Sequence, residues 1–524
     1  MTAWPKDTAN WRSETLYRDR PVACRRGAPS SITSLIDDFV QRQPDAEALI
    51  CNSSRITWDE LDQLSERLAA GLAQKSIHPG DPVLLLLNNS AEFVISLYAI
   101  IRAGAIAVPV GVREAGPSIA YMAEQSGAKA IIHSANFADI IPPLNISLIA
   151  RPDEDIWKFV ARHGSDQPLS IPPVSGEDTA LIMYTSGTTG KPKGAIVSHI
   201  GLLHVGLGYV DCMALGAADR SICAVPLSHI TGISANLLPM LCSGGTVIIM
   251  PEFNAQKFVD LVIAEQVTHT IMVPTMYNLI LSRTTLDGAA LGKWRIGAFG
   301  GAPMPPSMIQ ELHERLPNLQ LMNCYGATET AGAVTILPAD VIDDHADSVG
   351  WAIPGAEIVV MNDQGQSLAA GDVGELFIGG PSVTPGYWNN PDATRQNIVN
   401  GLWRSGDVGF IDAQGFVHIL DRMKDMINRG GFKIYTAEVE SVLNAHNDVV
   451  EAAVVGRPCA VLGERVDAYV SCNSFDADTA AQLKQWCASS LADYKVPETF
   501  HLSKQPLPRN ANGKIVKTQL RTAT

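Results

Sequence analysis

The feature that most constrains the fold is an apolar run followed at once by a loop rich in glycine and hydroxyl side chains. Residues 180–184 read ALIMY, which predicts a buried strand, and residues 184–194 read YTSGTTGKPKG. Glycine lets backbone amides approach an anion closely, and hydroxyl and ammonium groups add donors and positive charge. A strand that ends in such a loop predicts an α/β protein with a phosphate-binding site.

The loop differs from the common P-loop of nucleotide-binding proteins. Only two residues separate Gly187 from Gly190, and Pro192 follows Lys191, whereas a P-loop has four residues between its glycines and then Gly-Lys-Ser/Thr. On composition alone an exposed polar loop is an alternative, because such clusters usually form loops. Further motifs are needed to decide.

Six further blocks follow the loop along the chain. They are Pro226–His229 (PLSH), Gly300–Pro303 (GGAP), Tyr325–Thr330 (YGATET), Trp403–Asp407 (WRSGD), Asp421–Asp425 (DRMKD) and Asn512–Lys514 (NGK). Together with the loop they resemble the adenylate-forming superfamily, which contains acyl-CoA synthetases, peptide-synthetase adenylation domains and beetle luciferases. The resemblance extends from about residue 30 to the C-terminus and is greatest to AMP-forming acyl-CoA ligases.

The resemblance implies which residues bind ATP. Tyr325 would stack on adenine, and Thr328 would contact the α-phosphate. Asp407 would accept both ribose hydroxyls, with Arg422 assisting at the ribose or the phosphates. The whole implied set is Thr185, Ser186, Gly187, Thr188, Thr189, Lys193, Gly301, Asn323, Tyr325, Gly326, Thr328, Asp407, Arg422 and Lys514.

The resemblance also implies a magnesium cofactor and four catalytic residues. Glu329 and Thr185 would bind Mg2+, an ion that usually takes one or two carboxylates and keeps water. Lys514 would bridge carboxylate and phosphate oxygens as charge builds, and His229 would gate the acyl pocket. Taken alone, Glu329 reads as an exposed turn residue, Lys514 as a solvated surface lysine and His229 as a structural histidine.

The acceptor and acyl sites follow from the same resemblance. Gly430 and Gly431 would line a tunnel for CoA, since only glycine permits so close an approach. Residues 227–238 carry no carboxylate, which argues against an α-amino acid substrate. A fatty, alicyclic or aryl monocarboxylic acid transferred to CoA is expected, and an enzyme that loads a carrier protein is the alternative. The implied acyl pocket is His229, Gly232, Met276, Gly301 and Ala302.

Length and patterning predict two domains, because 524 residues exceed the ~250–300 at which one core stops growing. Strand–helix alternation up to about residue 335 predicts covered sheets, and glycine-rich alternating runs from about 345 to 420 predict hairpins. The expected fold is α/β. A large N-terminal domain, residues 1–423, would hold two doubly wound sheets plus a small β-barrel. Residues 424–524 would form a small mobile α+β domain, with Lys424 as the hinge.

Composition limits the partners. A net charge of −15 and a pI of about 5.2 argue against nucleic acid. Nine cysteines without a C-x-x-C pair predict reduced thiols in the cytoplasm, and neither a disulfide framework nor a zinc site. The apolar stretch 93–112 is interrupted by Arg102, Gly104 and Pro109, so no transmembrane segment is expected. The expected partners are ATP, CoA and a small carboxylic acid, with a homodimer as one expected assembly.

One position departs from the family pattern. Thr436 stands where the superfamily usually has proline, directly before residues 437–440 (AEVE). Threonine is a competent N-cap residue. The following helix is therefore expected to begin with Thr436 as its cap, and activity is expected to be retained.

Overall fold

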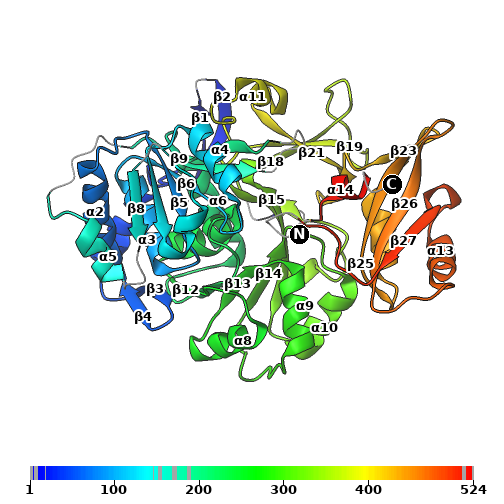
Figure 1. Ribbon diagram of the computed structural model, residues 1–524, viewed down its shortest axis with the longest axis horizontal. Coiled ribbons are helices and arrows are strands. Elements are labelled where there is room, and N and C mark those ends of the chain that lie inside the picture. The colour runs from blue at the N-terminus through cyan, green and yellow to red at the C-terminus, as the bar shows by residue number, and fades with distance from the viewer. Residues whose placement is uncertain are drawn as a thin grey trace. The chain divides into compact units, whose positions relative to one another are not determined.

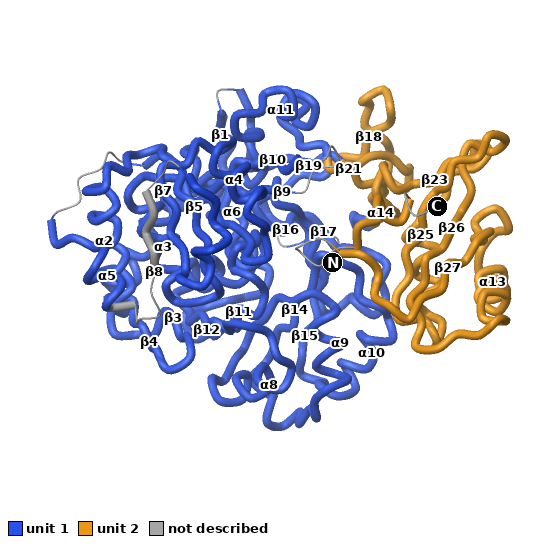
Figure 2. Tube along the Cα trace, in the orientation of Figure 1, with its two compact units in different colours: residues 1–358, 377–404, 414–417 blue, residues 359–376, 405–413, 418–524 orange. Residues whose placement is uncertain are grey.

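The computed structural model describes residues 4, 10–17, 19–144, 147–151, 156–167, 174–185, 191–509 and 515–521 (Figure 1). The chain divides into two compact units (Figure 2). The larger comprises residues 1–358, 377–404 and 414–417, and the smaller comprises residues 359–376, 405–413 and 418–524. Because the smaller unit includes stretches before Lys424, a domain boundary between residues 423 and 424 stays a prediction.

The first sheet of the larger unit has six strands in the order β10-β9-β6-β5-β7-β8. Five run parallel, and only β10 is antiparallel to its neighbour β9. Strands β5 and β6 are buried along their whole length, which explains their continuous apolar sequences. The bounds are β5 Pro82–Leu86, β6 Ile106–Pro109, β7 Ala130–Ser134, β8 Ser147–Arg151, β9 Thr179–Thr185 and β10 Lys193–Ser198.

The second sheet has nine strands in the order β17-β16-β15-β14-β13-β11-β12-β3-β4. The run from β15 to β3 is parallel, whereas β16 and β17 at one end of the order and β4 at the other are antiparallel to their neighbours. The bounds are β3 Glu47–Cys51, β4 Ser54–Thr57, β11 Arg220–Cys223, β12 Thr246–Ile249, β13 His269–Met272, β14 Ile296–Gly300, β15 Gln320–Ala327, β16 Gly332–Leu337 and β17 Trp351–Ala352.

Helix α3 (Ala91–Arg102) packs against β5 and β6 of the first sheet and against β3 of the second. Residues 91–101 of this helix are therefore buried on every side, as expected for a helix between two layers. The Ser90 hydroxyl caps it by accepting the Phe93 N–H. The other helices are α1 Thr33–Arg42, α2 Trp58–Gln74, α4 Gly116–Ser126, α5 Ile156–His163, α6 His199–Met213, α7 Leu238–Ser243, α8 Ala255–Ala264, α9 Pro274–Arg283 and α10 Pro306–Arg315.

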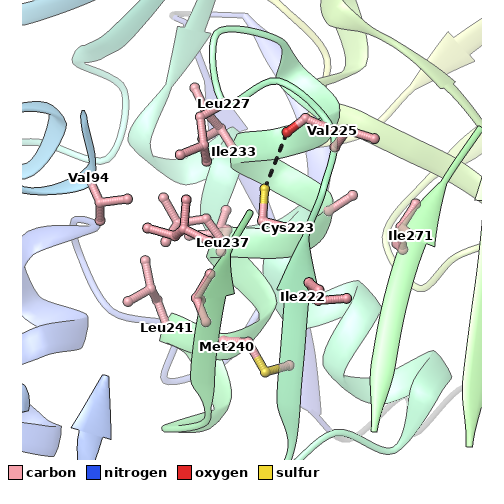
Figure 3. Close-up of a cluster of buried hydrophobic side chains, with 14 of the residues drawn as sticks. Val94, Ile222, Cys223, Val225, Leu227, Ile233, Leu237, Met240, Leu241 and Ile271 are labelled. Atoms are coloured by element: carbon pink, nitrogen blue, oxygen red, sulfur yellow. Dashed lines mark hydrogen bonds between the residues drawn. The ribbon is translucent and has the colours of Figure 1, made fainter. Parts of the chain in front are cut away.

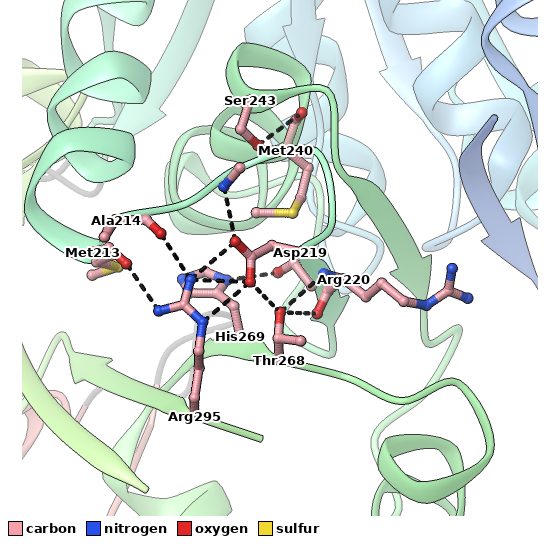
Figure 4. A network of polar contacts seen from close by, with 11 residues as sticks. Met213, Ala214, Asp219, Arg220, Met240, Ser243, Thr268, His269 and Arg295 are labelled. Carbon is pink, nitrogen blue, oxygen red and sulfur yellow. Dashed lines mark hydrogen bonds and ion pairs between the residues drawn. The ribbon is translucent and has the colours of Figure 1, made fainter. Parts of the chain in front are cut away.

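A polar network joins the amino ends of three parallel strands of the nine-stranded sheet (Figure 4). Asp219 precedes β11, Thr268 precedes β13 and Arg295 precedes β14. Arg295 Nη2 lies 2.9 Å from Asp219 Oδ2, and Thr268 Oγ1 donates to Asp219 Oδ1 at 2.7 Å. Burial opposes ionisation, but hydrogen bonds from Arg295, Thr268 and the Gly216 N–H lower the pKa of Asp219 on balance. The carboxylate therefore stays charged and holds the strand ends together.

The expected small barrel is a five-stranded sheet in this structure. Its order β18-β19-β21-β20 has ends at β18 and β20, and β22 pairs with β21. The division between the two units passes through strands of this sheet. The bounds are β18 Glu357–Met361, β19 Gly374–Gly379, β20 Ile398–Val399, β21 Leu402–Ile411 and β22 Val417–Arg422, with helix α11 at Pro391–Asn397.

The C-terminal part of the smaller unit is the expected α+β module. Its sheet has the order β24-β23-β26-β25, with β27 parallel to β26. Helices α12 and α13 pack on one another, and Val439, Leu443 and Leu483 join the buried core of this module. The bounds are β23 Ile427–Arg429, β24 Phe432–Ile434, β25 Val449–Cys459, β26 Gly463–Cys472, β27 Thr499–Ser503, α12 Thr436–Asn444, α13 Thr479–Ser490 and α14 Lys517–Arg521.

Two further predictions can be compared with the described residues. None of the nine cysteines, all of which lie in the described ranges, forms a disulfide bond. No helix in the described ranges has both the length and the apolar character that crossing a bilayer requires.

Candidate active site

The carboxyl ends of β13, β14 and β15 lie side by side, because these strands are parallel neighbours. Strand β14 ends at the GGAP block, and β15 carries Asn323 and Tyr325 before it runs into Thr328 and Glu329. Ligands of open α/β sheets bind at this edge. Strand order thus brings together motifs that are separate in sequence.

Close backbone packing explains a glycine at this edge. A Cβ on Gly326 would lie 1.9 Å from the carbonyl oxygen of Gly332 on the adjacent strand. Asn323 is also fixed, since its Nδ2 donates to the Ser348 carbonyl at 3.1 Å. These contacts hold Tyr325, between them in sequence, in a defined position.

Glu329 is held by a residue that the motifs did not identify. The Tyr387 hydroxyl donates to Glu329 Oε1 at 2.9 Å, and the Glu329 carbonyl accepts the Thr384 N–H at 2.7 Å. Tyr387 is buried, and this burial together with the negative charge of Glu329 raises the pKa of its phenol, which stays protonated and donates. The sequence Gly386-Tyr387-Trp388 lies outside the blocks that carry the resemblance, so only the structure reveals this contact.

Tyr387 also connects Glu329 to the phosphate loop. Lys193 Nζ lies 5.5 Å from the centre of the Tyr387 ring, in a cation–π arrangement. Tyr387 forms a β-bridge with Ala195, and the Trp388 N–H donates to the Gly194 carbonyl at 2.8 Å. Tyr387 therefore contacts both the candidate metal ligand, Glu329, and the loop lysine, Lys193.

The two ends of the phosphate loop face each other across an antiparallel pair. Lys193 on β10 is the register partner of Thr185 on β9. The loop thus connects the two strands of an antiparallel ladder. Ser186, Gly187, Thr188 and Thr189 of this loop lie outside the described residues, and so does Lys514.

Of the predicted acyl-pocket residues, Gly232 lies on a π-helix, Thr231–Leu237, that the sequence did not predict. His229 lies just before it, and the His229 carbonyl accepts the Ile233 N–H at 3.2 Å. A Cβ on Gly232 would lie 2.3 Å from the Pro226 carbonyl oxygen, so glycine is required here. Met276 of α9 is almost fully buried, whereas Gly301 and Ala302 are exposed. Such π-helices are frequent at functional sites.

Buried apolar side chains of the π-helix pack with those around Cys223 (Figure 3). Leu227, Ile233 and Leu237 are buried around Cys223 of β11, whose thiol donates to the Val225 carbonyl at 3.5 Å. Burial raises the pKa of Cys223 to about 12, so the thiol is neutral. Two residues of the π-helix, Ile233 and Leu237, are thus buried next to neutral, apolar groups.

In the smaller unit the two predicted ribose-binding residues are in contact. Arg422 Nε lies 2.6 Å from Asp407 Oδ1, and the Asp407 N–H donates to the Ser405 hydroxyl at 3.0 Å. The Asp407 side chain is 3% exposed and that of Arg422 is 48% exposed. A buried carboxylate thus accepts from an arginine whose far end reaches solvent.

Gly430 and Gly431 form the turn between β23 and β24, with φ angles of 61° and 92°. These left-handed values favour glycine. The Gly430 N–H donates to the Leu462 carbonyl at 2.7 Å, which fixes the turn. Lys424 lies in the turn between β22 and β23, and its carbonyl accepts from Arg521 at 3.2 Å.

The expectation that Thr436 caps α12 is wrong. The N-cap is Tyr435, which makes no side-chain capping bond, and Thr436 is the first helical residue. Its side chain turns to the Asp421 carboxylate instead, to which Oγ1 donates at 2.9 Å. Helix α12 still begins where the sequence predicted, for a different reason.

The donor set fits a magnesium ion that is held mainly by a nucleotide. Within the described ranges no three His, Cys, Asp or Glu side chains gather as a metal cluster. Glu329 is a single carboxylate fixed in orientation by Tyr387. Mg2+ commonly takes one or two carboxylates and completes its shell with phosphates and water, so Glu329 and Thr185 remain the residues that would hold it.

Two cavities in the larger unit, of about 580 and 670 Å³, contain none of the predicted site residues. The first lies beside α10, and the second is lined by Arg295 and Met213, close to the amino ends of the strands.

Most of the chain is similar to known proteins. Residues 36–388 match the AMP-binding enzyme family, and residues 438–514 match the AMP-binding enzyme C-terminal domain. The feruloyl-CoA synthase of Amycolatopsis sp is 33% identical over 479 residues, 91% of this chain and 96% of that protein. The fatty acid–[acyl-carrier-protein] ligase ScoC of Streptomyces coeruleorubidus is 29% identical over 509 residues, 92% of this chain and 94% of that protein.

A solved structure extends the match to the fold. O-succinylbenzoate coenzyme A synthetase (MenE) from Bacillus subtilis, in complex with ATP and magnesium ion, gives a TM-score of 0.84 at 30% identity. The match covers 93% of this chain and 99% of that one. The chain therefore belongs to the AMP-binding enzymes, the adenylate-forming family that its motifs resemble.

Proposed function

We propose that this enzyme activates a monocarboxylic acid with ATP to form acyl-AMP and then transfers the acyl group to CoA. The single observation that carries the proposal is the placement of Glu329 beside Lys193 through Tyr387. Tyr387 contacts both side chains, and in this proposal the Glu329 carboxylate would hold Mg2+ and the Lys193 ammonium group would meet the phosphates.

In the first step a carboxylate oxygen of the acid attacks the α-phosphorus of ATP, and the bond to the bridging oxygen breaks to release pyrophosphate. Negative charge on the phosphoryl oxygens is met by fixed donors, which is the main source of catalysis in such transfers. Lys193 and Lys514 would supply positive charge, and Asp407 with Arg422 would orient the ribose. Bound Mg2+ would neutralise phosphate charge.

In the second step the CoA sulfur attacks the acyl carbon, and AMP leaves with the bonding electrons. We assign His229 to the wall of the acyl pocket and Gly430 and Gly431 to the path of the thiol. The buried apolar residues of the segment that follows His229, Ile233 and Leu237, support an acid with an apolar body, such as an aryl, alicyclic or fatty acid.

A carrier protein is the second candidate acceptor. The observation in its favour is the relationship to ScoC, whose name states a carrier-protein acceptor. Both acceptors present a phosphopantetheine thiol, so the first step is the same for both candidates. They can be separated by offering preformed acyl-AMP to CoA and to a phosphopantetheinylated carrier protein.

The test is a panel of aryl, alicyclic and fatty acids scored by exchange of labelled pyrophosphate into ATP. We expect acid-dependent exchange with at least one apolar monocarboxylate. The Lys514→Ala variant should lose at least ~10²–10³-fold, since one preorganised donor is commonly worth that much. No exchange with any acid contradicts the proposal, and near-normal exchange by Lys514→Ala removes this lysine from the mechanism.

A further inference from the structure

A buried polar cluster lies where β22 ends and where α12 and α14 begin, all within the smaller unit. Asp421 is 7% exposed and Thr436 is fully buried. Thr436 donates to Asp421 through both its backbone N–H and its hydroxyl. Lys517 Nζ donates to the Thr436 hydroxyl at 2.8 Å and to Glu440 Oε1 at 2.7 Å. Thr436 thus links the lysine to the carboxylate.

The cluster is poorly suited to stabilising the fold. It contains two carboxyl groups and one ammonium group, and burial raises the pKa of both Asp421 and Glu440 despite the nearby Lys517. Buried ionic groups often contribute little net stability compared with apolar residues of the same size. A positional role accounts for the cluster better than a stabilising one.

The cluster is connected to the candidate ribose site, Asp407 and Arg422, through the backbone. The Arg422 N–H donates to Asp421 Oδ1 at 2.7 Å, and Arg422 Nε lies 2.6 Å from Asp407. The Met423 N–H donates to the Gly406 carbonyl at 2.8 Å. The Arg422 side chain is half exposed, so its own burial does not hold it in place. Its position depends on the backbone that Asp421 anchors.

The bonds from Thr436 need a threonine at this position. Proline, the usual residue of the superfamily here, has neither an N–H nor a hydroxyl. A chain with proline could offer Asp421 neither bond. The anchor through Thr436 is therefore a feature of this chain that the general family pattern does not supply.

We propose that Thr436 and Lys517 are positioning residues that hold Arg422 against Asp407 for the ribose of ATP, an inference that rests on the proposed function. They touch no reacting atom and act through Asp421. Their effect should appear in the use of ATP during adenylation. It should not appear in the transfer of a preformed acyl-AMP to CoA at saturating concentrations.

Three substitutions at Thr436 keep or remove its hydrogen bonds to Asp421 to different extents. Thr436→Ser keeps both bonds, Thr436→Val keeps the N–H and the shape, and Thr436→Pro removes both donors. Proline is favoured at the first position of a helix, so α12 should persist. We expect the KM for ATP to be near normal for the serine variant and to rise about 5- to 10-fold for the valine and proline variants. The dissociation constant for ATP by calorimetry without acid should rise in parallel.

Lys517 offers a matched comparison. Lys517→Met leaves the buried Asp421 and the partly buried Glu440 without their cation and can unfold the module, so it is paired with Glu440→Gln in a double variant. We expect this double variant to raise the KM for ATP as Thr436→Val does. The control is Lys495→Met, which breaks another 2.7 Å ion pair on α12, to Glu438. That control should leave the KM for ATP unchanged.

The outcomes separate this inference from the proposed function. If the unaltered enzyme activates no acid, the proposed function fails, while calorimetry still measures whether Thr436 affects ATP binding. If the enzyme is active and the valine and proline variants bind ATP normally, the positioning role is overturned. It is also overturned if both half-reactions and the unfolding temperature fall together, because the cluster would then serve only the fold.

Discussion

At the scale of single residues, Glu329 and Tyr387 contribute differently to the proposed metal site. Glu329 supplies the negative charge, and the Tyr387 hydroxyl fixes one carboxylate oxygen at 2.9 Å. Glu329→Gln removes the charge and keeps the shape, whereas Tyr387→Phe removes the orientation and keeps the charge. The two variants therefore test different parts of the same proposed metal site.

We predict that Glu329→Gln raises the Mg2+ concentration for half-maximal pyrophosphate release about 10-fold or more, and Tyr387→Phe about 3- to 5-fold, as one hydrogen bond to a charged group would give. Direct binding of Mn2+ in the presence of ATP provides a second measurement. The control is Tyr469→Phe, which removes another 2.9 Å phenol hydrogen bond, to the Leu520 carbonyl. An unchanged Mg2+ titration for Glu329→Gln would remove it from the metal site.

At the scale of elements, the Asp219 network ties three strand ends and should make stability depend on pH. The pKa of Asp219 is lowered in the fold. Its contribution is therefore complete above the unfolded value of about 3.9 and is lost as the pH falls through the lowered value. Stability should thus fall on acidification to the extent that this carboxylate becomes protonated.

Asp219→Asn should lower the free energy of unfolding of the larger unit by about 2 kcal/mol at pH 7. This is less than for fully buried pairs, because the Arg295 side chain is 36% exposed. The difference from the unaltered enzyme should shrink as the pH falls through the lowered pKa of Asp219. Thermal unfolding at several pH values measures both effects.

The control is Asp392→Asn, in an exposed pair with Arg395, which should change the free energy of unfolding by no more than about 0.5 kcal/mol. A pH-independent difference would contradict the assignment.

The elements also show what sequence can predict. The strand–helix alternation before residue 335 and the alternating runs from about 345 to 420 could be predicted, because local periodicity determines them. The helix Ala91–Arg102 and the strand Glu357–Met361 lie in these two stretches. The place of β3 next to β12 could not be predicted, since Leu49 pairs with Val247 through the tertiary fold. The π-helix was missed for the same reason: buried Asn236 on it exchanges hydrogen bonds with the distant backbone of Ile271.

The candidate site divides in the same way. Motifs identified Glu329, Asp407 and Arg422, and the structure brings Asp407 and Arg422 into contact. Tyr387 was missed because its role exists only once the chain folds back beside β10. The bonds of Thr436 were misread because a threonine before a helix usually caps it, whereas here a buried carboxylate competes for the hydroxyl.

At the scale of the whole molecule, the proposed reaction needs one small domain to serve two steps. Lys514 would act in adenylation, and Gly430 with Gly431 would act in transfer to CoA. A rotation about few residues is the simplest way to exchange them. Lys424 lies between β22 and β23, after the last residue of the ribose site and before the module with its own core.

We predict that Lys424→Pro separates the two half-reactions. Proline fixes φ near −65° and restricts the preceding residue, so the linker should be locked in one arrangement. If it is locked for adenylation, acyl-AMP forms at a near-normal rate while transfer to CoA falls at least about 10-fold, and the reverse holds for the other arrangement.

The control is Lys424→Ala, which removes the side chain and keeps the backbone free, so it should retain both steps. Each step is measured alone, by pyrophosphate release in a single turnover and by thioester formation from preformed acyl-AMP. Equal losses in both steps by a folded Lys424→Pro protein, or no loss in either, would place the hinge elsewhere.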